Sequence, residues 1–593
     1  MKTGKLDKLL SLILKWRVRH LTNRQFAIIL SLIIGIIVGF AAVTLRWMIG
    51  GLADFIHSES FSTVKSYFYF GLPLIGIGLT LLFIRFFIKG NLPSGISYLL
   101  YIIGRKESRI KRKHTFGHLV GSALTVSFGG SVGVEGPIVL TGSALGAKIG
   151  EFLHIDRQMR MLLIGCGSSA AIAAIFNAPV AGVLFTLEVI LAEMKVGLLV
   201  PLLIASVTGI TVSKLLLGDH TILLFKSVES IHLSDYPLFI LLGLVCGALS
   251  VYFMRINSFF IRRMNGIKSK TRTYLLGGLS LGLLIVAFPS LFGEGYWTLR
   301  AIINNETHSI LDDTLYHSFE QKDKILLLFI FGSILLKPIA TSLTRLAGGV
   351  GGVFAPTLLM GGLSGFLVSR LANKWGNLSF SEHNFTLVGM AGIAAGVLHS
   401  PLTSIFLIAE LTNGYELFVP LMIVAAISYG TSFFFERHSF YTKTLAERGD
   451  LIVHDKDKSV LTSIGIRQVI ERDLKEIKLD GSLRDLVQAI SVSERNIFPV
   501  IDELRRFQGI ISLNDVRDKI FKPELYDQIL IKDIMHQSED IIDIEEAMDV
   551  IMKKFDDCNA WNLPVVDKGV YIGFISKSKI FNSYRKRLKE DNI

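Results

Sequence analysis

Apolar residues fill the chain from about Phe26 to Phe435, after which the sequence takes on the mixed charge of a soluble domain. About 20 consecutive apolar residues cross the hydrocarbon core of a bilayer as a helix. Runs approaching that length are Phe26–Val43, Pro237–Met254 and Ile325–Leu336 with its flanks. The pattern predicts a polytopic all-α membrane domain over 23–450 and a soluble tail.

Other apolar runs are short and interrupted by glycine or proline, such as Gly117–Gly130, Gly165–Pro179, Gly348–Gly362 and Val388–Pro401. Broken helices in both halves of a membrane protein are typical of a binding site near the middle of the bilayer. The alternative is that Gly and Pro are simply commoner in membrane helices than in soluble ones. Their clustering favours discontinuous helices.

An internal repeat supports that interpretation. Phe176–Glu188 reads FNAPVAGVLFTLE and Leu398–Glu410 reads LHSPLTSIFLIAE, each with a Glu nine residues after its proline. Upstream, GVEGP ends at Pro137 and GVFAP ends at Pro356. We expect two homologous halves, about 24–217 and 237–450, and half-repeats of this kind often have inverted topology.

The tail contains a second, smaller repeat. Asn496–Ile511 and Trp561–Ile575 each read as strand, turn and strand, followed by a polar helix. Amphipathic helices are expected upstream, around Leu483–Ser491 and Ile544–Phe555. We expect a linker over 451–463, a first α+β domain over 464–522 and a second over 528–588.

Basic residues gather in short segments, which indicates membrane topology rather than a nucleic-acid surface. The chain has 62 Lys and Arg against 50 Asp and Glu, a net charge of +12, but Ala53–Ser66 has almost no basic residue. By the positive-inside rule, the basic clusters in residues 1–22 and Arg105–Lys113 are cytoplasmic. We expect a cell-membrane protein with a cytoplasmic N-terminal helix over 1–22, a cytoplasmic C-terminus, and the lipid bilayer but no nucleic acid as a partner.

Catalytic and metal-binding patterns are missing from the sequence. Cys166, Cys246 and Cys558 have neither disulfide nor metal-ligand spacing. No nucleophile–base pair or phosphate-binding loop stands out either. We therefore expect no enzyme activity, no metal and no required cofactor.

The most informative segment is Gly129–Pro137, which reads GGSVGVEGP. Glycines let a backbone approach its surroundings closely, and a proline suits the first turn of a helix. Glu135 is therefore predicted at a helix N-terminus at membrane depth, where exposed N–H groups favour an anion. A carboxylate that competes with a permeating anion for these donors would act as a gate. Because an ionisable residue at this depth is costly, its default interpretation is functional.

These motifs resemble those of the CLC family of chloride channels and chloride/proton antiporters, and the tail resembles a tandem pair of CBS domains. GVEGP at 133–137 resembles the family's G-K/R-E-G-P, GVFAP at 352–356 its G-x-F-x-P, and PSGIS at 93–97 its GSGIP. Phe440-Tyr441 followed by Leu445 resembles its last short helix, which carries a pore tyrosine. The resemblance covers nearly the whole chain and implies a homodimer with one pathway per subunit.

The resemblance also implies roles for individual residues, with chloride as the transported ion. Glu135 would be the gating glutamate. Chloride is large and weakly hydrated, so neutral donors can hold it without a fixed positive charge. Ser94 and Tyr441 would offer hydroxyls, although on position alone Ser94 could be a helix N-cap and Tyr441 an interfacial anchor. The other chloride-binding residues implied are Gly133, Val134, Val353 and Phe354.

Some residues depart from the family pattern around the pathway. Val134 stands where the family has Lys or Arg, which removes a positive charge beside Glu135. Pro93 and Ser97 replace the first Gly and the Pro of GSGIP, which changes the loop around Ser94.

A further departure concerns proton coupling. In proton-coupled relatives the FNAP stretch ends in two adjacent glutamates, the second of which relays protons, whereas here Glu188 is followed by Val189. Val189 cannot carry a proton, so the relay is absent at that position and a gated chloride channel is favoured over a chloride/proton antiporter. Glu188 could deliver protons through water, or it could cap a helix end.

Two further hypotheses concern the tail. A CBS-regulated cation transporter would need several membrane carboxylates, and this chain has few. CBS pairs can bind adenine nucleotides, with the ribose held by the Asp of an S/T-x-x-D motif, which Ser512–Asp515 fits with Asp515 as the contact. Lys579 replaces that Asp in the second copy. The alternative is that the pair mainly strengthens the dimer.

Overall fold

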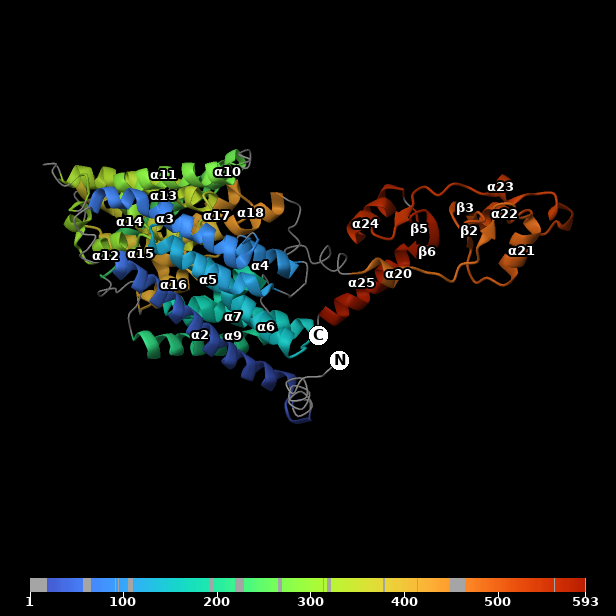
Figure 1. Ribbon diagram of the computed structural model, residues 1–593, viewed down its shortest axis with the longest axis horizontal. Coiled ribbons are helices and arrows are strands. Elements are labelled where there is room, and N and C mark those ends of the chain that lie inside the picture. The colour runs from blue at the N-terminus through green and yellow to red at the C-terminus, as the bar shows by residue number, and fades with distance from the viewer. Residues whose placement is uncertain are drawn as a thin grey trace. The chain divides into compact units, whose positions relative to one another are not determined.

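The computed structural model describes residues 17, 19–56, 65–90, 92–93, 95–104, 110–191, 196–218, 229–264, 269–312, 314–316, 322–376, 379–412, 414–447, 464–558 and 560–591. The chain divides into a helical unit that ends at Leu451 and a second unit that begins at Ile452 (Figure 1). The predicted helix over 1–22 and the predicted linker over 451–463 lie almost wholly outside the described residues.

The first unit is built of helices. In the described part of the chain, eight helices are long and apolar enough to cross a membrane, which confirms the predicted polytopic helical domain. The helices of this unit are α2 (Asn23–Ile56), α3 (Lys65–Phe83), α4 (Gly95–Gly104), α5 (Arg112–Ser127), α6 (Glu135–Phe152), α7 (Arg157–Phe176), α8 (Pro179–Phe185), α9 (Val196–Leu217), α10 (Tyr236–Met264), α11 (Lys270–Ala287), α12 (Tyr296–Ile303), α13 (Lys322–Leu346), α14 (Phe354–Gly376), α15 (Glu382–Leu398), α16 (Pro401–Leu411), α17 (Phe418–Phe435) and α18 (Phe440–Glu447).

The interrupted apolar runs form helix breaks with the same geometry in both halves. Helix α7 ends at Phe176 and is followed by Asn177, which has a left-handed backbone with φ of 55°, and Pro179 then begins α8. Helix α15 ends at Leu398 and is followed by His399, also with φ of 55°, and Pro401 begins α16. A left-handed residue ends a helix and a proline suits the start of the next, so the repeat seen in the sequence has a structural counterpart.

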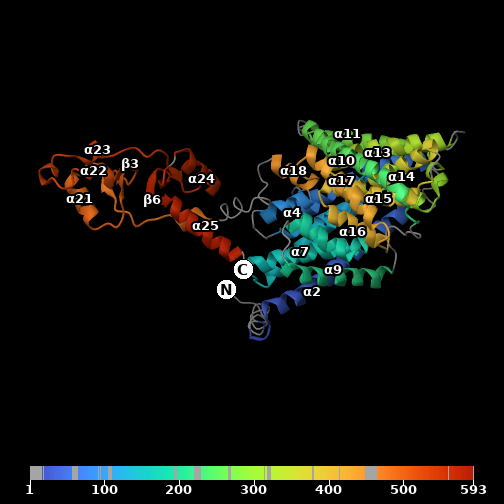
Figure 2. The ribbon, with the colours of Figure 1, turned by 180° about the vertical axis from the view of Figure 1, so that it is seen from behind.

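Glycines allow two helix pairs in the interior to pack closely. A Cβ atom on Gly142 of α6 would lie 2.3 Å from the carbonyl oxygen of Gly167 of α7, and one on Gly361 of α14 would lie 2.3 Å from that of Gly389 of α15. Only a small residue permits such an approach between membrane helices. Figures 1 and 2 show α2 and α9 along one edge of the helical unit and α10 and α11 along the opposite edge.

The second unit contains two small mixed sheets of the same topology. In each sheet the first strand runs parallel to the second, and the second pairs antiparallel with the third through a hairpin. The first lobe contains β1 (Ile477–Lys478), α21 (Leu483–Ser491), β2 (Ile497–Ile501), β3 (Phe507–Ser512), α22 (Leu513–Val516) and α23 (Ile531–Ile534). The second contains α20 (Ile466–Val469), β4 (Ile542–Asp543), α24 (Met548–Asp557), β5 (Asn562–Asp567), β6 (Val570–Ser576) and α25 (Lys577–Asp591).

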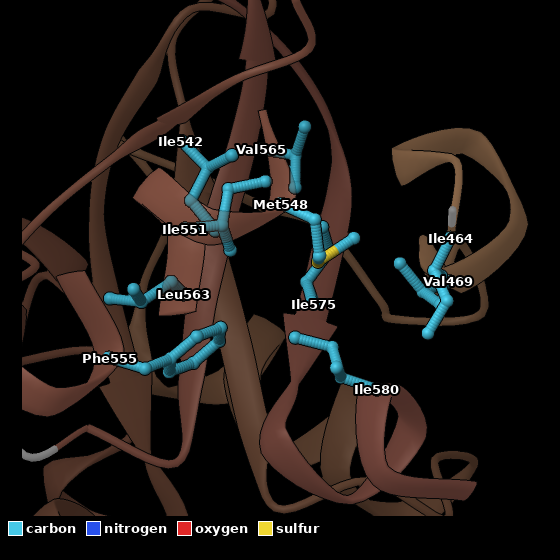
Figure 3. Packing of buried hydrophobic residues seen from close by; sticks show 10 residues of the cluster. All are labelled: Ile464, Val469, Ile542, Met548, Ile551, Phe555, Leu563, Val565, Ile575 and Ile580. Carbon is cyan, nitrogen blue, oxygen red and sulfur yellow. The ribbon is translucent and has the colours of Figure 1, made fainter. Parts of the chain in front are cut away.

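The two lobes exchange the segments that precede their first strands. Ile464 and Val469 pack in the apolar core of the second lobe, beside Ile575 and Ile580 (Figure 3). In return, His536 pairs with Ile510 on β3 of the first lobe. The lobes therefore depend on each other for their cores and sheet edges.

One predicted tail helix begins later than its apolar pattern indicates. The expected helix starts at Ile544, whereas α24 starts at Met548. The Ile544 N–H donates to the carbonyl of Val566 on β5 and so continues the sheet. The Asp543 N–H donates to the Glu546 carboxylate in a local turn, which delays the helix.

Candidate functional site

Two glycine loops meet at the start of α6 and α14. The Gly133 N–H donates to the Gly352 carbonyl at 2.9 Å, and the Gly352 N–H donates back to Gly133 at 2.6 Å. This short antiparallel bridge brings the predicted motifs GVEGP and GVFAP together, although they are distant in the sequence. The first N–H groups of both helices, which have no partner inside their own helix, are thereby gathered in one region.

Glu135 begins α6 and is 1% exposed. Its Oε1 accepts a hydrogen bond from the Tyr296 hydroxyl at 3.1 Å. Its Oε2 has no partner among the described residues and lies so close to Gly133 that a Cβ there would be 2.0 Å away. The carboxylate is therefore folded back over the glycine loop, with one oxygen unsatisfied. Val134, also buried, donates its N–H to the Glu294 carboxylate at 3.3 Å.

A cavity of about 30 Å³ lies beside these loops. Tyr441 of α18 is buried in its wall, and the Tyr441 hydroxyl has no hydrogen-bond partner in the described part of the chain. Ser97 of α4 donates its hydroxyl to the Tyr441 carbonyl at 2.9 Å and so fastens α18 to α4. The remaining wall residues are Gly95, Ile96, Gly136, Arg345, Gly351, Gly352, Val353 and Phe440. We refer to this space as the central cavity.

The structure brings together only part of the predicted chloride-binding set. Val353 and Tyr441 line the central cavity, and Gly133 and Val134 form the loop that carries Glu135. Phe354 follows Val353 and begins α14, and its ring packs against Phe176 and Phe185. The resemblance implies its backbone N–H, not its ring, as a chloride donor, and that stays a prediction. Ser94 lies outside the described residues.

Glu188 and Val189 lie in a π-helical turn, Thr186–Leu191. The Glu188 carboxylate accepts hydrogen bonds from the N–H groups of Leu402 and Thr403 and from the Thr403 hydroxyl, at 3.1, 2.8 and 2.6 Å. It therefore caps the N-terminus of α16. Val189 is an apolar side chain, 8% exposed.

Several charged residues that sequence reasoning missed surround the gate region. Lys337 of α13 is fully buried and donates to the Ser131 hydroxyl at 2.9 Å and the Gly293 carbonyl at 3.0 Å. It interacts electrostatically with Glu135 and Glu294, and Arg46 interacts with Glu294. Lys337 and Arg46 therefore bring basic groups from distant parts of the chain to the region where Val134 leaves the motif without one.

Arg345 is a further charged residue that sequence reasoning missed. It lines the central cavity. That chloride is held there by neutral donors stays a prediction. A charged side chain in an apolar span is costly. The presence of Lys337 and Arg345 in such a span could therefore have marked both as functional candidates.

Asp515 lies at the start of α22 in the tail. Its Oδ2 accepts the Ser512 N–H at 2.7 Å in a capping box, and its Oδ1 lies 3.6 Å from the His536 ring nitrogen. In the second copy the Ser576 hydroxyl accepts the Lys579 N–H at 3.2 Å. Both motifs therefore cap helices.

Comparisons with known proteins place this fold. Residues 79–432 match the family described as voltage gated chloride channel. The chloride channel protein CLC-f of Arabidopsis thaliana is 25% identical over 450 residues, covering 67% of this chain, and the chain spans only 56% of that relative's length. The voltage-gated ClC-type chloride channel ClcB of Escherichia coli O157:H7 is 31% identical over 335 residues, covering 55% of this chain and 75% of that protein.

Solved structures share the fold at lower identity. A CLC-type fluoride/proton antiporter aligns with a TM-score of 0.58 and 23% identity, covering 71% of this chain and 98% of its own. A slow cyanobacterial chloride/proton antiporter aligns with a TM-score of 0.58 and 19% identity, covering 74% of this chain and 100% of its own. A eukaryotic CLC transporter aligns with a TM-score of 0.57 and 17% identity, covering 96% of this chain and 98% of its own. Since the family match extends over more than half of the 593 residues, this protein belongs to the voltage gated chloride channel family.

Proposed function

We propose that this protein carries chloride across the membrane through the central cavity, with Glu135 as the gate. The observation that carries the proposal is the buried Tyr441 hydroxyl, which lacks a protein partner and lies in the wall of a cavity closed on another side by the start of α14. A hydroxyl and first-turn N–H groups are donors, and donors without protein partners suit an anion. The cavity wall contains no carboxylate among its described residues.

The gate follows from the position of the Glu135 side chain. Its Oε2, which has no hydrogen-bond partner among the described residues, lies close to the two paired glycine loops, where a permeating chloride would need the same space and donors. When the carboxylate is protonated, its attraction to these donors falls and the side chain can leave. We therefore expect chloride flux to rise as the pH falls.

Passive conduction is the mode that we favour. Val189 cannot accept a proton, and the Glu188 carboxylate is already engaged by three donors at the start of α16. One observation favours the second candidate, chloride/proton antiport: Glu135 and Glu294 interact electrostatically, and two neighbouring carboxylates can hold and pass a proton.

Flux measurements on the purified protein in liposomes decide between these modes. A chloride gradient is imposed, valinomycin is added, and a pH probe reports proton movement. Chloride flux without proton movement is expected, whereas uphill proton movement would establish antiport. In Glu135→Gln we expect fast flux that no longer depends on pH, and wild-type pH dependence in that variant would exclude Glu135 as the gate.

Several properties accompany this proposal. By resemblance to the CLC family we propose a homodimer in the cell membrane, two inverted halves, cytoplasmic termini and no enzyme activity. We also propose that the tail is a CBS pair with the boundaries given above. Adenine nucleotide binding at Asp515 stays a prediction, and calorimetric titration with ATP, ADP and AMP tests it.

A further inference from the structure

A second acid flanked by glycines lies beside the gate. Residues 293–296 read GEGY and lead into α12. Both glycines have left-handed backbones, with φ of 56° at Gly293 and 83° at Gly295. Such a backbone favours glycine at both positions, and the turn fixes the directions in which Glu294 and Tyr296 leave the chain. We refer to residues 293–296 as the GEGY turn.

Two hydrogen bonds join the GEGY turn to the start of α6. The Tyr296 hydroxyl donates to Glu135 Oε1 at 3.1 Å, and the Val134 N–H donates to Glu294 Oε1 at 3.3 Å. Because Val134 and Glu135 are adjacent in the chain, the two carboxylates are held close to one another. They interact electrostatically as like charges.

Basic groups from two other helices surround this pair of carboxylates. Lys337 of α13 is fully buried and donates to Ser131 Oγ at 2.9 Å and to the Gly293 carbonyl at 3.0 Å, so it links the GEGY turn to the glycine loop before α6. Its charge acts on both carboxylates, and Arg46 of α2 acts on Glu294. The charged and titratable groups that face Glu294 are Glu135, Tyr296, Lys337 and Arg46.

The two carboxylates differ in their access to water. Glu135 is 1% exposed, and its Oε2 has no hydrogen-bond partner among the described residues. Glu294 is partly exposed. A proton from the surrounding water therefore meets Glu294 outside the closely packed space that encloses Glu135.

We infer that Glu294 is a second proton-binding residue of the gate and that it acts on chloride flux through Glu135. When both carboxylates are ionised they repel each other, so the pair takes up a proton more readily than Glu135 would alone. This inference rests on the proposed function, because it gives Glu294 a part in opening the gate proposed there. It holds for passive conduction and for antiport alike.

The first assay is chloride flux in liposomes across a range of pH. Glu294→Gln and Glu294→Ala both remove the charge, and the Gln side chain keeps an oxygen that can accept the Val134 N–H. Glu294→Asp keeps the charge. Glu306→Gln, the same chemical change on an exposed residue that follows α12, is the matched control.

We expect the pH of half-maximal flux to fall by about one unit in Glu294→Gln and in Glu294→Ala, since Glu135 then loses a neighbouring like charge. Opening these variants would need about a tenfold higher proton concentration. Glu294→Asp and Glu306→Gln should keep the wild-type midpoint. In a Glu135→Gln background, Glu294→Gln should change nothing, because it acts through Glu135.

A purely structural role for Glu294 would give a different result. Loss of a cap would lower the melting temperature of Glu294→Ala more than that of Glu294→Gln and leave the flux midpoint of both in place. A wild-type midpoint in both variants would therefore overturn the inference.

Infrared difference spectra between acidic and alkaline buffers report carboxyl protonation in the full-length protein without transport, and so separate the two proposals. Glu294→Gln should remove one protonated-carboxyl signal and move the Glu135 signal to lower pH. If the wild type carries no chloride but this shift is seen, the proposed function is wrong and the second proton site stands. If Glu135 gates the flux but neither the midpoint nor the spectra depend on Glu294, the proposed function stands and the inference fails.

Discussion

Gly133 and Gly352 donate their backbone N–H groups to each other's carbonyls. Gly133 precedes α6 and Gly352 precedes α14, so the bridge joins the two glycine loops at the point where these helices begin. A side chain at either position would force a neighbour to move, since a Cβ on Gly133 would meet the Glu135 carboxylate and one on Gly352 would lie 3.0 Å from the Gly136 nitrogen. The gate residue and the bridge therefore occupy one closely packed space.

Gly133→Ala should open the gate. Its methyl group would lie 2.0 Å from Glu135 Oε2 and 2.9 Å from Ala355 Cβ. The flexible end of the glutamate is the more easily displaced of the two neighbours. We expect chloride flux at alkaline pH to rise towards its acidic value, measured in liposomes across a range of pH. Gly430→Ala is the control, because a Cβ there meets nothing within 4 Å. A wild-type pH profile in Gly133→Ala would show that the carboxylate position seen here does not limit flux.

Tyr441→Phe should weaken chloride binding without weakening the fold. The lost hydroxyl is buried and has no hydrogen-bond partner in the described part of the chain, so its removal should not lower the free energy of unfolding of the anion-free protein. A hydrogen bond to a charged ligand contributes about 1.5–3 kcal/mol, which corresponds to at least about a tenfold rise in the chloride Kd. Calorimetric titration and thermal melting report the two quantities.

Tyr252→Phe is the matched control for that substitution. The Tyr252 hydroxyl donates to the Leu335 carbonyl at 2.9 Å, so its removal should cost about 1 kcal/mol of stability and leave chloride affinity unchanged. Equal effects of the two variants on chloride affinity would show that Tyr441 acts only through packing.

The sequence predicts those features of the site that depend on local backbone chemistry. The breaks at Asn177 and His399 follow from the prolines two residues later, and Glu135 at a helix start follows from its glycines and Pro137. These signals lie within a few residues of the feature that they predict, and the helix break occurs twice, before Pro179 and before Pro401.

The charged surroundings of the pathway could not be predicted in the same way. Arg345 meets Asn257 and Lys337 meets Ser131, pairs that are 88 and 206 residues apart. An apolar run containing one cation indicates that the cation must be satisfied, but not by which group. The exchange of segments between the tail lobes could not be predicted for the same reason. The sequence around Val469 indicates that this residue is buried, but not that it lies in the core of the second lobe.

The tail should lose a small part of its stability in acid through Asp473. Hydrogen bonding to Arg495 lowers the pKa of this carboxyl, so the pair contributes above the unfolded pKa of about 3.9 and the contribution is lost as the pH falls further. Because the pair is exposed, we expect at most about 0.5 kcal/mol. Thermal melts between about pH 5 and about pH 3 should therefore show a smaller loss of stability in Asp473→Asn than in the wild type. The same loss in both proteins would contradict the prediction.

Glu188→Gln and Glu410→Gln should lower the stability of the protein by similar amounts, and neither should change proton transport. The Glu410 carboxylate accepts the N–H groups of Val180 and Ala181 at the start of α8, just as Glu188 caps α16. Replacement of either by Gln weakens charge-assisted caps, and we expect a loss of about 1–2 kcal/mol in each case, seen as a lower melting temperature. Since neither carboxylate is free to relay protons, chloride flux should stay uncoupled in both variants. If the wild type moves protons and only Glu188→Gln abolishes this, Glu188 belongs to a proton path and the protein is an antiporter.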